Sequence, residues 1–407
     1  MTPELQDIMN SMSDSAHDEL THHILPFWIN RMPDESQGGF YGRINGRGST
    51  VADAPRGAIL NARILWSFSA AYLTLKDPLY LEIASRARDY IFHNFFDDHF
   101  GGTYWCLNSN GDPLDTKKQV YSIAFFIYAL CWYHSATGDR ESLYRAVSLY
   151  ELIEKYSFDR RDNGYYEAFT REWGDIEDMR LSEKDENEKK TMNTHLHILE
   201  AYTSLYRIWP DSGLRDKLAN MVHIFTEKIV DPETGHLRLF FDEAWNSRSS
   251  LVSYGHDIEA SWLLYEAAAA LGEEDSVKGT ALRIATAAHD GLADDGSLYY
   301  ERDDVKGHFD RDRHWWVQAE AVVGFINAWE ISGDRSWLEL ASAAYDYIIT
   351  RLADREGGEW YWSIRADGSI NTDDDKAGFW KCPYHNTRMC LEIMARFYSK
   401  LAINKLQ

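Results

Sequence analysis

The sequence predicts an all-α protein: an (α/α)6 barrel of twelve helices with short β-hairpins at one end. A glycine followed closely by aromatic or apolar residues recurs six times, at intervals of 63, 62, 71, 61 and 62 residues, with paired helical patterns between copies. Because the repeat runs through the whole chain, we predict one domain over residues 1–407, against the two or three that length alone suggests. The six glycines are Gly39, Gly102, Gly164, Gly235, Gly296 and Gly358.

Each repeat glycine opens a segment that we interpret as a short β-hairpin. Aromatic residues follow the glycine, as in Gly102-Thr103-Tyr104-Trp105. Several copies then reach a turn dipeptide, such as Asn45-Gly46, Asn110-Gly111 or Asp367-Gly368. Strand-forming residues before such a dipeptide favour a hairpin. The copy at Gly235 is the weakest of the six.

The helices are predicted from apolar residues at helical spacing, such as Leu65, Phe68 and Tyr72. Short links such as Thr137-Gly138-Asp139 make successive helices antiparallel. One helix precedes the first hairpin and one follows the last, so these two can pair and close the ring. The predicted helices are 3–23, 57–73, 78–97, 118–137, 140–157, 191–208, 213–230, 255–271, 275–292, 314–332, 335–353 and a last one starting near Pro383.

Charge and composition narrow the function classes. The net charge is −23 and no basic block stands out, so neither nucleic acid nor an anionic membrane is an expected partner. No run approaches about 18 apolar residues, and no signal peptide is visible. Four cysteines without a CxxC pair fit a reducing compartment. We therefore expect a cytoplasmic protein, and a monomer.

Aromatic residues are abundant, with 15 tryptophans and 24 tyrosines. Part of this content belongs in the core. Flat rings with polar tips also suit carbohydrate, because their faces match the C–H faces of a sugar and their polar groups bond its hydroxyls. A small-molecule sugar is therefore a candidate substrate.

One repeat is longer than the others, and its extra residues lie in 172–190. The segment is rich in charge, and we interpret it as a solvated loop. The alternative is a flap over the mouth of the barrel.

The helix after each hairpin begins with polar or aromatic residues that a core would not select. If these six helices form the inner ring, they all begin at one end of the barrel, and the residues at their starts surround one cavity. Those residues are Arg63, Tyr121, Asn193 with His197, His256 with Glu259, Trp315 and Trp316 with Glu320, and Trp380 with His385.

Helical spacing sorts the histidines. Asn193 and His197 are four apart and share a face, whereas His195 points away, so we place His197 in the cavity and His195 in the packing. His-x-His on a helix is a poor chelate, and no metal site is predicted. His256 and His385 lie in first helical turns, where the helix dipole favours the neutral imidazole.

The helix that carries His256 has the most detailed signal. Ser253 is a candidate N-cap. His256 and Glu259 are three apart, so Glu259 is expected to orient or tune the imidazole. Such a pair alone is more often a structural contact. The recurrence of similar sets at equivalent places in the repeat favours a functional interpretation.

Three neutral histidines, an arginine, a carboxylate and indoles in one pocket suit proton transfer next to a carbonyl. In an open-chain aldose, a general base can remove the acidified proton at C2, and Arg63 can stabilise the enediolate oxygen. A second imidazole on the opposite face would return the proton from the other side and give the C2 epimer. This chemistry requires no cofactor, and no GxGxxG, P-loop or metal motif is present.

The sequence resembles the N-acylglucosamine 2-epimerase superfamily and, within it, the cellobiose 2-epimerase branch. The similarity spans nearly the whole chain, and Lys381-Cys382-Pro383-Tyr384-His385 looks specific to that branch. The resemblance implies reversible C2 epimerisation of the reducing-end glucose of cellobiose and lactose, without a cofactor. The segments that carry it are 61–66, 193–202, 253–264, 314–320 and 378–386.

The resemblance also implies roles for the candidate residues. His256 and His385 become the general acid/base pair, and His197 assists them. Trp315 is preferred to Trp316 as a sugar-stacking indole, with Trp316 packing near Glu320. The substrate-binding set that it implies is Arg63, Tyr121, Asn193, Glu259, Trp315 and Trp380, of which Glu259 supports His256.

Three other functions stay open. A monosaccharide 2-epimerase, such as a mannose 2-epimerase, and an aldose–ketose isomerase would share the enediolate, and only the placement of the second imidazole separates them. A glycoside hydrolase on the same barrel needs two carboxylates, for which Glu259 and Glu320 are candidates, but it leaves three histidines without a task. A non-catalytic sugar-binding protein would not need the imidazoles.

Overall fold

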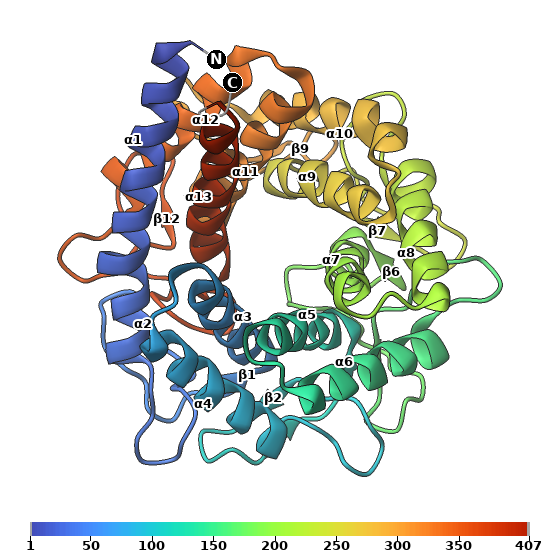
Figure 1. Ribbon diagram of the computed structural model, residues 1–407. Helices are drawn as coiled ribbons and strands as arrows, with labels where there is room; N and C mark the ends of the chain where they lie inside the picture. The colour runs from blue at the N-terminus through green and yellow to red at the C-terminus, as the bar shows by residue number, and fades with distance from the viewer. Residues whose placement is uncertain (1, 405–407) are drawn as a thin grey trace.

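Two concentric rings of helices make up the computed structural model, which describes residues 2–404 (Figure 1). The inner helices contact one another in order and return from α13 to α3, so the ring is closed as predicted. Their bounds are α3 (Ala58–Leu75), α5 (Val120–Thr137), α7 (Met192–Ile208), α9 (Tyr254–Leu271), α11 (Trp315–Ser332) and α13 (Tyr384–Asn404).

Each outer helix packs against the inner helix of its own repeat, and α1 packs against α13 to complete the circle. Three outer helices, α6, α8 and α12, end in a widened π-helical turn. Their bounds are α1 (Pro3–Glu19) with a π turn (Leu20–Ile24) and α2 (Leu25–Arg31), α4 (Pro78–Asn94), α6 (Arg140–Leu152) with Ile153–Ser157, α8 (Ser212–Ile224) with Phe225–Ile229, α10 (Glu274–Ala288) with a 3-10 turn (His289–Gly291), and α12 (Arg335–Tyr347) with Ile348–Leu352.

The first outer helix is longer than predicted, because it continues to Arg31 instead of ending near His23. The π turn at Leu20–Ile24 precedes Pro26, which has no N–H to donate, and the helix runs on past it. The other predicted helices agree with the structure to within a few residues. Counting the first helix as one continuous rod, twelve helices form the barrel, as predicted.

Burial explains why these helices divide into two rings. The inner helix α5 is buried along almost its whole length, as expected for a helix that is apolar on all sides. Outer helices are amphipathic, and α4, α6, α8 and α12 begin with an aspartate cap: Asp139, for example, accepts hydrogen bonds from the N–H groups of Glu141 and Ser142. Gly138, in the link between the rings, has a φ of 76°, which ends α5 in the left-handed conformation.

The six predicted hairpins are present at one end of the barrel. Each begins with a bridge that brackets the repeat glycine, such as Phe96 with Thr103 or Phe158 with Tyr165. All six glycines have φ between 62° and 86°, a left-handed turn conformation that glycine adopts at least cost.

Short strands link each repeat to the next. The two residues before an inner helix pair with the hairpin of the following repeat, and Ile44 pairs with Ala377 to join the first repeat to the last. These strands fix the starts of the inner helices relative to one another. They are β1 (Arg56–Gly57), β2 (Cys106–Leu107), β3 (Pro113–Asp115), β4 (Lys118–Gln119), β5 (Ala168–Phe169), β6 (Lys190–Thr191), β7 (Phe240–Phe241), β8 (Val252–Ser253), β9 (Glu301–Asp303), β10 (His308–Asp310), β11 (Arg313–His314) and β12 (Ser363–Ile364).

Helix α3 has the length and hydropathy of a membrane span, contrary to the sequence-based expectation. It lies in the inner ring, and 78% of the 18-residue segment is buried inside the barrel. Its apolar character is therefore accounted for by packing between neighbouring helices.

Candidate active site

The predicted site residues gather where the inner helices begin, at the hairpin end of the barrel. Contacts between them run around the ring. Tyr121 of α5 contacts Arg63 of α3 and His197 of α7, and Trp316 of α11 contacts His256 of α9 and His385 of α13. Residues distant in the sequence therefore form one cluster, as the repeat predicted.

Arg63 is a buried cation bonded mainly to uncharged groups. Its Nη2 donates a hydrogen bond of 3.0 Å to the Tyr121 hydroxyl, and its guanidinium lies 4.3 Å from the Phe125 ring centre and 4.8 Å from that of Tyr384. Its Nε has no hydrogen-bond partner within residues 2–404. An arginine that is not neutralised by a direct carboxylate bond can stabilise an anion that forms beside it.

His197 faces the cluster, and His195 does not. His197 Nδ1 lies 3.0 Å from Glu200 Oε2, and its ring packs edge-on against Tyr121. His195 instead bonds the backbone through both nitrogens, to the Thr191 carbonyl and the Tyr165 N–H. The structure therefore agrees with the prediction from helical spacing that His197 faces the cluster and His195 points away from it.

Asn193 shares the face of His197, and its Oδ1 has no partner among the described residues. It lies with His256 on the wall of one pocket. A buried amide oxygen without a partner is costly, and a sugar hydroxyl could satisfy it.

His256 begins helix α9 at the N-cap Ser253. The Ser253 hydroxyl lies 2.8 Å from His256 Nδ1, so it bonds the imidazole instead of a backbone N–H. Burial lowers the pKa of His256 to about 3, which favours the neutral ring. The neutral imidazole agrees with the prediction, and burial is the largest cause of the lowered pKa.

Glu259 does not contact His256, contrary to the expectation from their spacing. Its Oε1 accepts a hydrogen bond of 2.6 Å from Arg388 Nη2 on α13. Burial, aided by the charge of Glu320, raises the pKa of Glu259 to about 8. The raised pKa favours the protonated form of Glu259, which belongs to a network with Arg388.

His385 is held by Glu320. Its Nδ1 lies 2.6 Å from Glu320 Oε1, and burial lowers the pKa of the imidazole to about 3. Because a carboxylate accepts the bond, the proton of the neutral ring is on Nδ1, which leaves the Nε2 lone pair free. The same argument applies to His197 and Glu200.

Of the two adjacent tryptophans, Trp316 lies beside the histidines, where Trp315 was expected. Trp316 is half-buried, and its ring centre is 4.8 Å from that of His256 and 5.7 Å from that of His385. Trp315 is 3% exposed and packs against Trp362. The geometry therefore favours Trp316 over Trp315 as the indole that faces a substrate. Trp380 remains half-buried, 6.1 Å from Tyr121.

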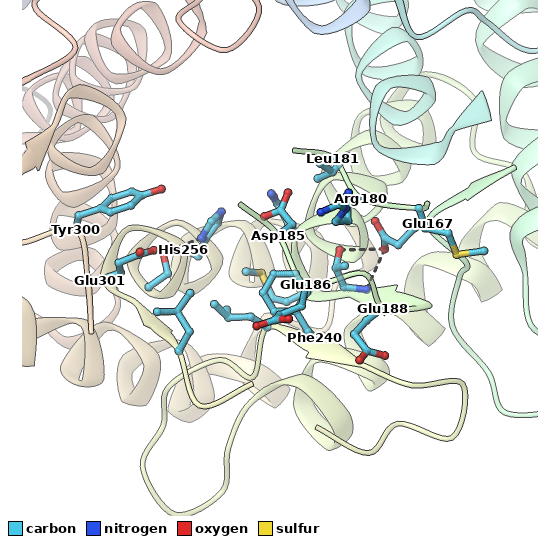
Figure 2. A pocket seen from close by; sticks show the side chains of 17 residues that line it. Glu167, Arg180, Leu181, Asp185, Glu186, Glu188, Phe240, His256, Tyr300 and Glu301 are labelled. Atoms are coloured by element: carbon cyan, nitrogen blue, oxygen red, sulfur yellow. Dashed lines mark hydrogen bonds between the residues drawn. The ribbon is translucent and has the colours of Figure 1, made fainter. Parts of the chain in front are cut away.

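The segment 172–190 lies over the site instead of extending into solvent. Met179, Leu181 and Asp185 line a pocket whose opposite wall includes His256. Figure 2 shows Asp185 and His256 projecting toward the same opening. Gln119 Nε2 bonds the Met179 carbonyl, which anchors the segment to the barrel. The interpretation as a purely solvated loop is wrong, and its position fits the alternative of a cover.

Arg388 is the main site residue that sequence reasoning missed. It is 1% exposed and bonds Glu200, Glu259 and Glu320, which come from three different inner helices. A signal was present, because Arg388 lies one helical turn beyond Tyr384 and His385. Its partners are 68 to 188 residues away, so spacing along one helix could not assign them.

Glu259, Glu320 and His385 could also hold a metal ion, since their ligand atoms lie within 4.8 Å of one another. Arg388 Nη2 donates to Oε1 of both glutamates at 2.6 Å. The guanidinium thus places a positive charge where a cation would otherwise lie.

Comparison with known proteins assigns the family. The model of the N-acylglucosamine 2-epimerase family matches residues 39–388. The chain belongs to this family. It is 56% identical to a cellobiose 2-epimerase of Bacteroides fragilis, over 92% of this chain and 97% of that protein. A cellobiose 2-epimerase of Ruminococcus albus is 43% identical, over 95% of this chain and 99% of that protein.

A solved structure agrees with the fold of this family member. The cellobiose 2-epimerase from Bacillus thermoamylovorans B4167 superimposes with a TM-score of 0.92 at 43% identity, covering 95% of this chain and 100% of that one. The resemblance inferred from the sequence motifs is confirmed, and the chain is a carbohydrate epimerase.

Proposed function

We propose that this epimerase interconverts cellobiose, and related β-1,4 disaccharides such as lactose, with their C2 epimers at the reducing-end glucose. The observation that carries the proposal is the placement of His256 and His385. Both imidazoles lie against Trp316 of α11, from the two inner helices that flank it, and each has its Nδ1 hydrogen-bonded. Two neutral bases around one aromatic platform suit removal and return of a proton at one carbon.

The reaction begins with the open-chain sugar. One imidazole Nε2 takes the proton from C2, and the C–H electron pair moves toward C1, so that an enediolate forms with its charge on the former carbonyl oxygen. Arg63 and Tyr121 stabilise that oxygen. The negative charge of the enediolate raises the pKa of the second imidazole, which takes up a proton from solvent. This imidazole delivers its proton to the other face of C2. The first imidazole then releases to solvent the proton that it took from C2.

His197 has a supporting role in this proposal. Its Nδ1 is held by Glu200, so its free Nε2 can exchange a proton with the ring oxygen or hydroxyls of the sugar. Asn193, Trp380 and Trp316 are the proposed contacts to sugar hydroxyls and faces. All of these residues come from one chain, and we propose that the monomer is active.

Carboxylate geometry argues against a hydrolase on this barrel. Glu259 and Glu320 accept hydrogen bonds from the same nitrogen of Arg388. A glycoside hydrolase needs its two carboxyl groups about 5 Å or more apart, on either side of a glycosidic bond. Two carboxylates that bind one nitrogen cannot flank a bond in that way.

Proton NMR of cellobiose incubated with the protein in D2O tests the proposal. We expect deuterium at C2 together with glucosyl-mannose. Glucosyl-fructose as the main product would instead establish an aldose–ketose isomerase. Release of free glucose, or no exchange with cellobiose, would contradict the proposal, and mannose and N-acetylglucosamine would then be tested.

A further inference from the structure

We infer that Arg388 is the positioning residue that holds both carboxylate-bound histidines of the site, His197 and His385. The inference rests on the proposed function and adds a residue to it. Arg388 lies on α13, one turn after His385, and only 1% of its surface is exposed. It touches neither imidazole through a hydrogen bond and acts through carboxylates.

Two Arg–Glu–His chains share this one guanidinium. Nη2 donates to Glu320 Oε1 at 2.6 Å, and the same oxygen accepts the Nδ1 proton of His385. Nη1 donates to Glu200 Oε1 at 2.5 Å, while Glu200 Oε2 accepts from His197 Nδ1. Each carboxylate is thus bonded both to Arg388 and to an imidazole, through one oxygen in Glu320 and through two in Glu200.

Ring contacts keep the guanidinium in its plane. Its central carbon lies 4.2 Å from the Tyr384 ring centre and 4.7 Å from that of Trp262. The Trp262 Nε1 donates to the second oxygen of Glu320, and the Tyr384 hydroxyl donates to Glu200. The fork of an arginine can serve carboxylates in different directions at once, which a lysine ammonium cannot do with the same geometry.

The charges support this role. Burial alone would raise the pKa of Glu320, but Arg388 and the bond from His385 outweigh it and lower the pKa to about 2. Glu200 is likewise kept ionised, against its burial, by Arg388 and His197. An ionised carboxylate can only accept, so each imidazole must present its Nδ1 proton to it and its Nε2 lone pair to the substrate. Without the guanidinium, two buried anions would face each other and one would take a proton.

The chain offers a matched control. Arg396 lies about two turns further along α13 and also bonds three glutamates, Glu266, Glu330 and Glu392. None of these three bonds a histidine within the described residues. Arg396→Gln therefore removes the same group from the same helix without touching an imidazole.

The experiment compares Arg388→Gln, Arg388→Lys and Arg396→Gln in the full chain, by kcat, KM and the pH profile of cellobiose epimerisation. For Arg388→Gln we expect kcat to fall about 100-fold or more, with KM changed far less. The acid limb of the pH–kcat profile of Arg388→Gln should move to higher pH. The charge of Arg388 lowers the pKa of His385, so the pKa should rise when that charge is removed. Arg388→Lys should lose about tenfold in kcat and keep the acid limb, because its charge is retained. Arg396→Gln should stay within about threefold.

A folded Arg388→Gln protein with the kcat and acid limb of Arg396→Gln would overturn the inference and leave the proposed function intact. If Arg388→Gln does not fold, Arg388→Lys decides, and a wild-type kcat in that variant would overturn it. A wild-type protein without C2 exchange on cellobiose contradicts the proposed function, and this inference falls with it.

Discussion

Helix α13 carries two arginines in nearly the same setting, and only one of them belongs to the site. Arg388 and Arg396 each bind three glutamates, and both lie over the ring of Trp262, at 4.7 Å and 6.0 Å. The cluster of Arg388 is almost completely buried, whereas Arg396 is 11% exposed and its glutamates are 19% to 31% exposed. Two of the three glutamates bound by Arg388, Glu200 and Glu320, also bond imidazoles.

This difference shows which features distinguish an ion-pair cluster of the active site from a structural one. At the Arg396 end, the glutamates are partly exposed, so water screens the ion pairs. At the Arg388 end, burial raises the pKa of Glu259 and lowers that of His385, whereas Arg388 and His385 lower the pKa of Glu320 against its burial. Burial and histidine attachment, and not the number of charges, distinguish the two clusters.

Removing an imidazole from the Arg388 cluster is expected to have the largest effect on activity. His385→Ala is expected to lower kcat about 10³-fold or more, because the base or acid on one face of C2 is lost. Asn327→Ala is the control, since Asn327 is the uncharged partner of Arg396 in the other cluster. NMR of cellobiose in D2O measures both. Near-normal epimerisation by a folded His385→Ala protein would remove His385 from the mechanism.

Exchanging one glutamate in each cluster is expected to have the next largest effect. Glu320→Gln should lower kcat about 100-fold, because an amide can present its NH2 to His385 and no longer fixes the Nδ1 proton. Glu330→Gln should stay within about threefold. Initial rates at saturating cellobiose check this pair. Equal losses in the two variants would mean that Glu320 matters only for folding.

A pH titration sharpens the difference in charge between the clusters. Glu259 has its folded-state pKa raised to about 8 from the usual 4.5, so the stability that it contributes is present at acidic pH and is lost as pH rises through 8. We expect the midpoint temperature of thermal unfolding of the wild-type protein to fall as the pH rises from 4.5 to about 8. We expect kcat to decline severalfold above pH 8. Glu259→Gln should flatten the stability change. The contrasting variant is Glu266→Gln, which should leave the slope unchanged.

The smallest effect on activity is expected at Arg396 itself. Arg396→Gln should lower the free energy of unfolding by about 1–2 kcal/mol, because it separates partly buried ion pairs, while its activity stays near that of the wild type. Urea unfolding followed by circular dichroism measures the change. A large loss of kcat without loss of stability would show that the two clusters are coupled through Trp262.

Much of the fold was predictable because it repeats. The left-handed turn at Gly39 recurs at five further glycines, and each recurrence adds evidence for the same local structure. The positions of Arg63, Tyr121, His197, His256 and His385 followed from the same argument, since every inner helix starts at one end of the barrel.

The pairing of side chains across the ring was not predictable in this way. Glu259 lies three residues from His256 but bonds Arg388, 129 residues away, because the rotation of α9 aims it at α13. Trp315 and Trp316 differ by about 100° in direction, and only the packing of α11 shows which one meets the histidines. The cover formed by 172–190 was only the alternative to a solvated loop, because its many charges are typical of a solvated segment.

The pairing of α1 with α13, which closes the ring, also determines when the protein can become active. His385 and Arg388 both lie on α13, which follows the other eleven barrel helices in the described sequence, and Glu359 binds Trp28 of α2 as well as Lys381 just before α13. The closing contacts join segments more than 300 residues apart, and contacts of such long range form late in folding. A nascent or truncated chain with five finished repeats would have His256 and Arg63 in place but no second base. Catalytic competence should therefore report completion of the barrel, so that turnover itself can serve as an assay of the last folding step.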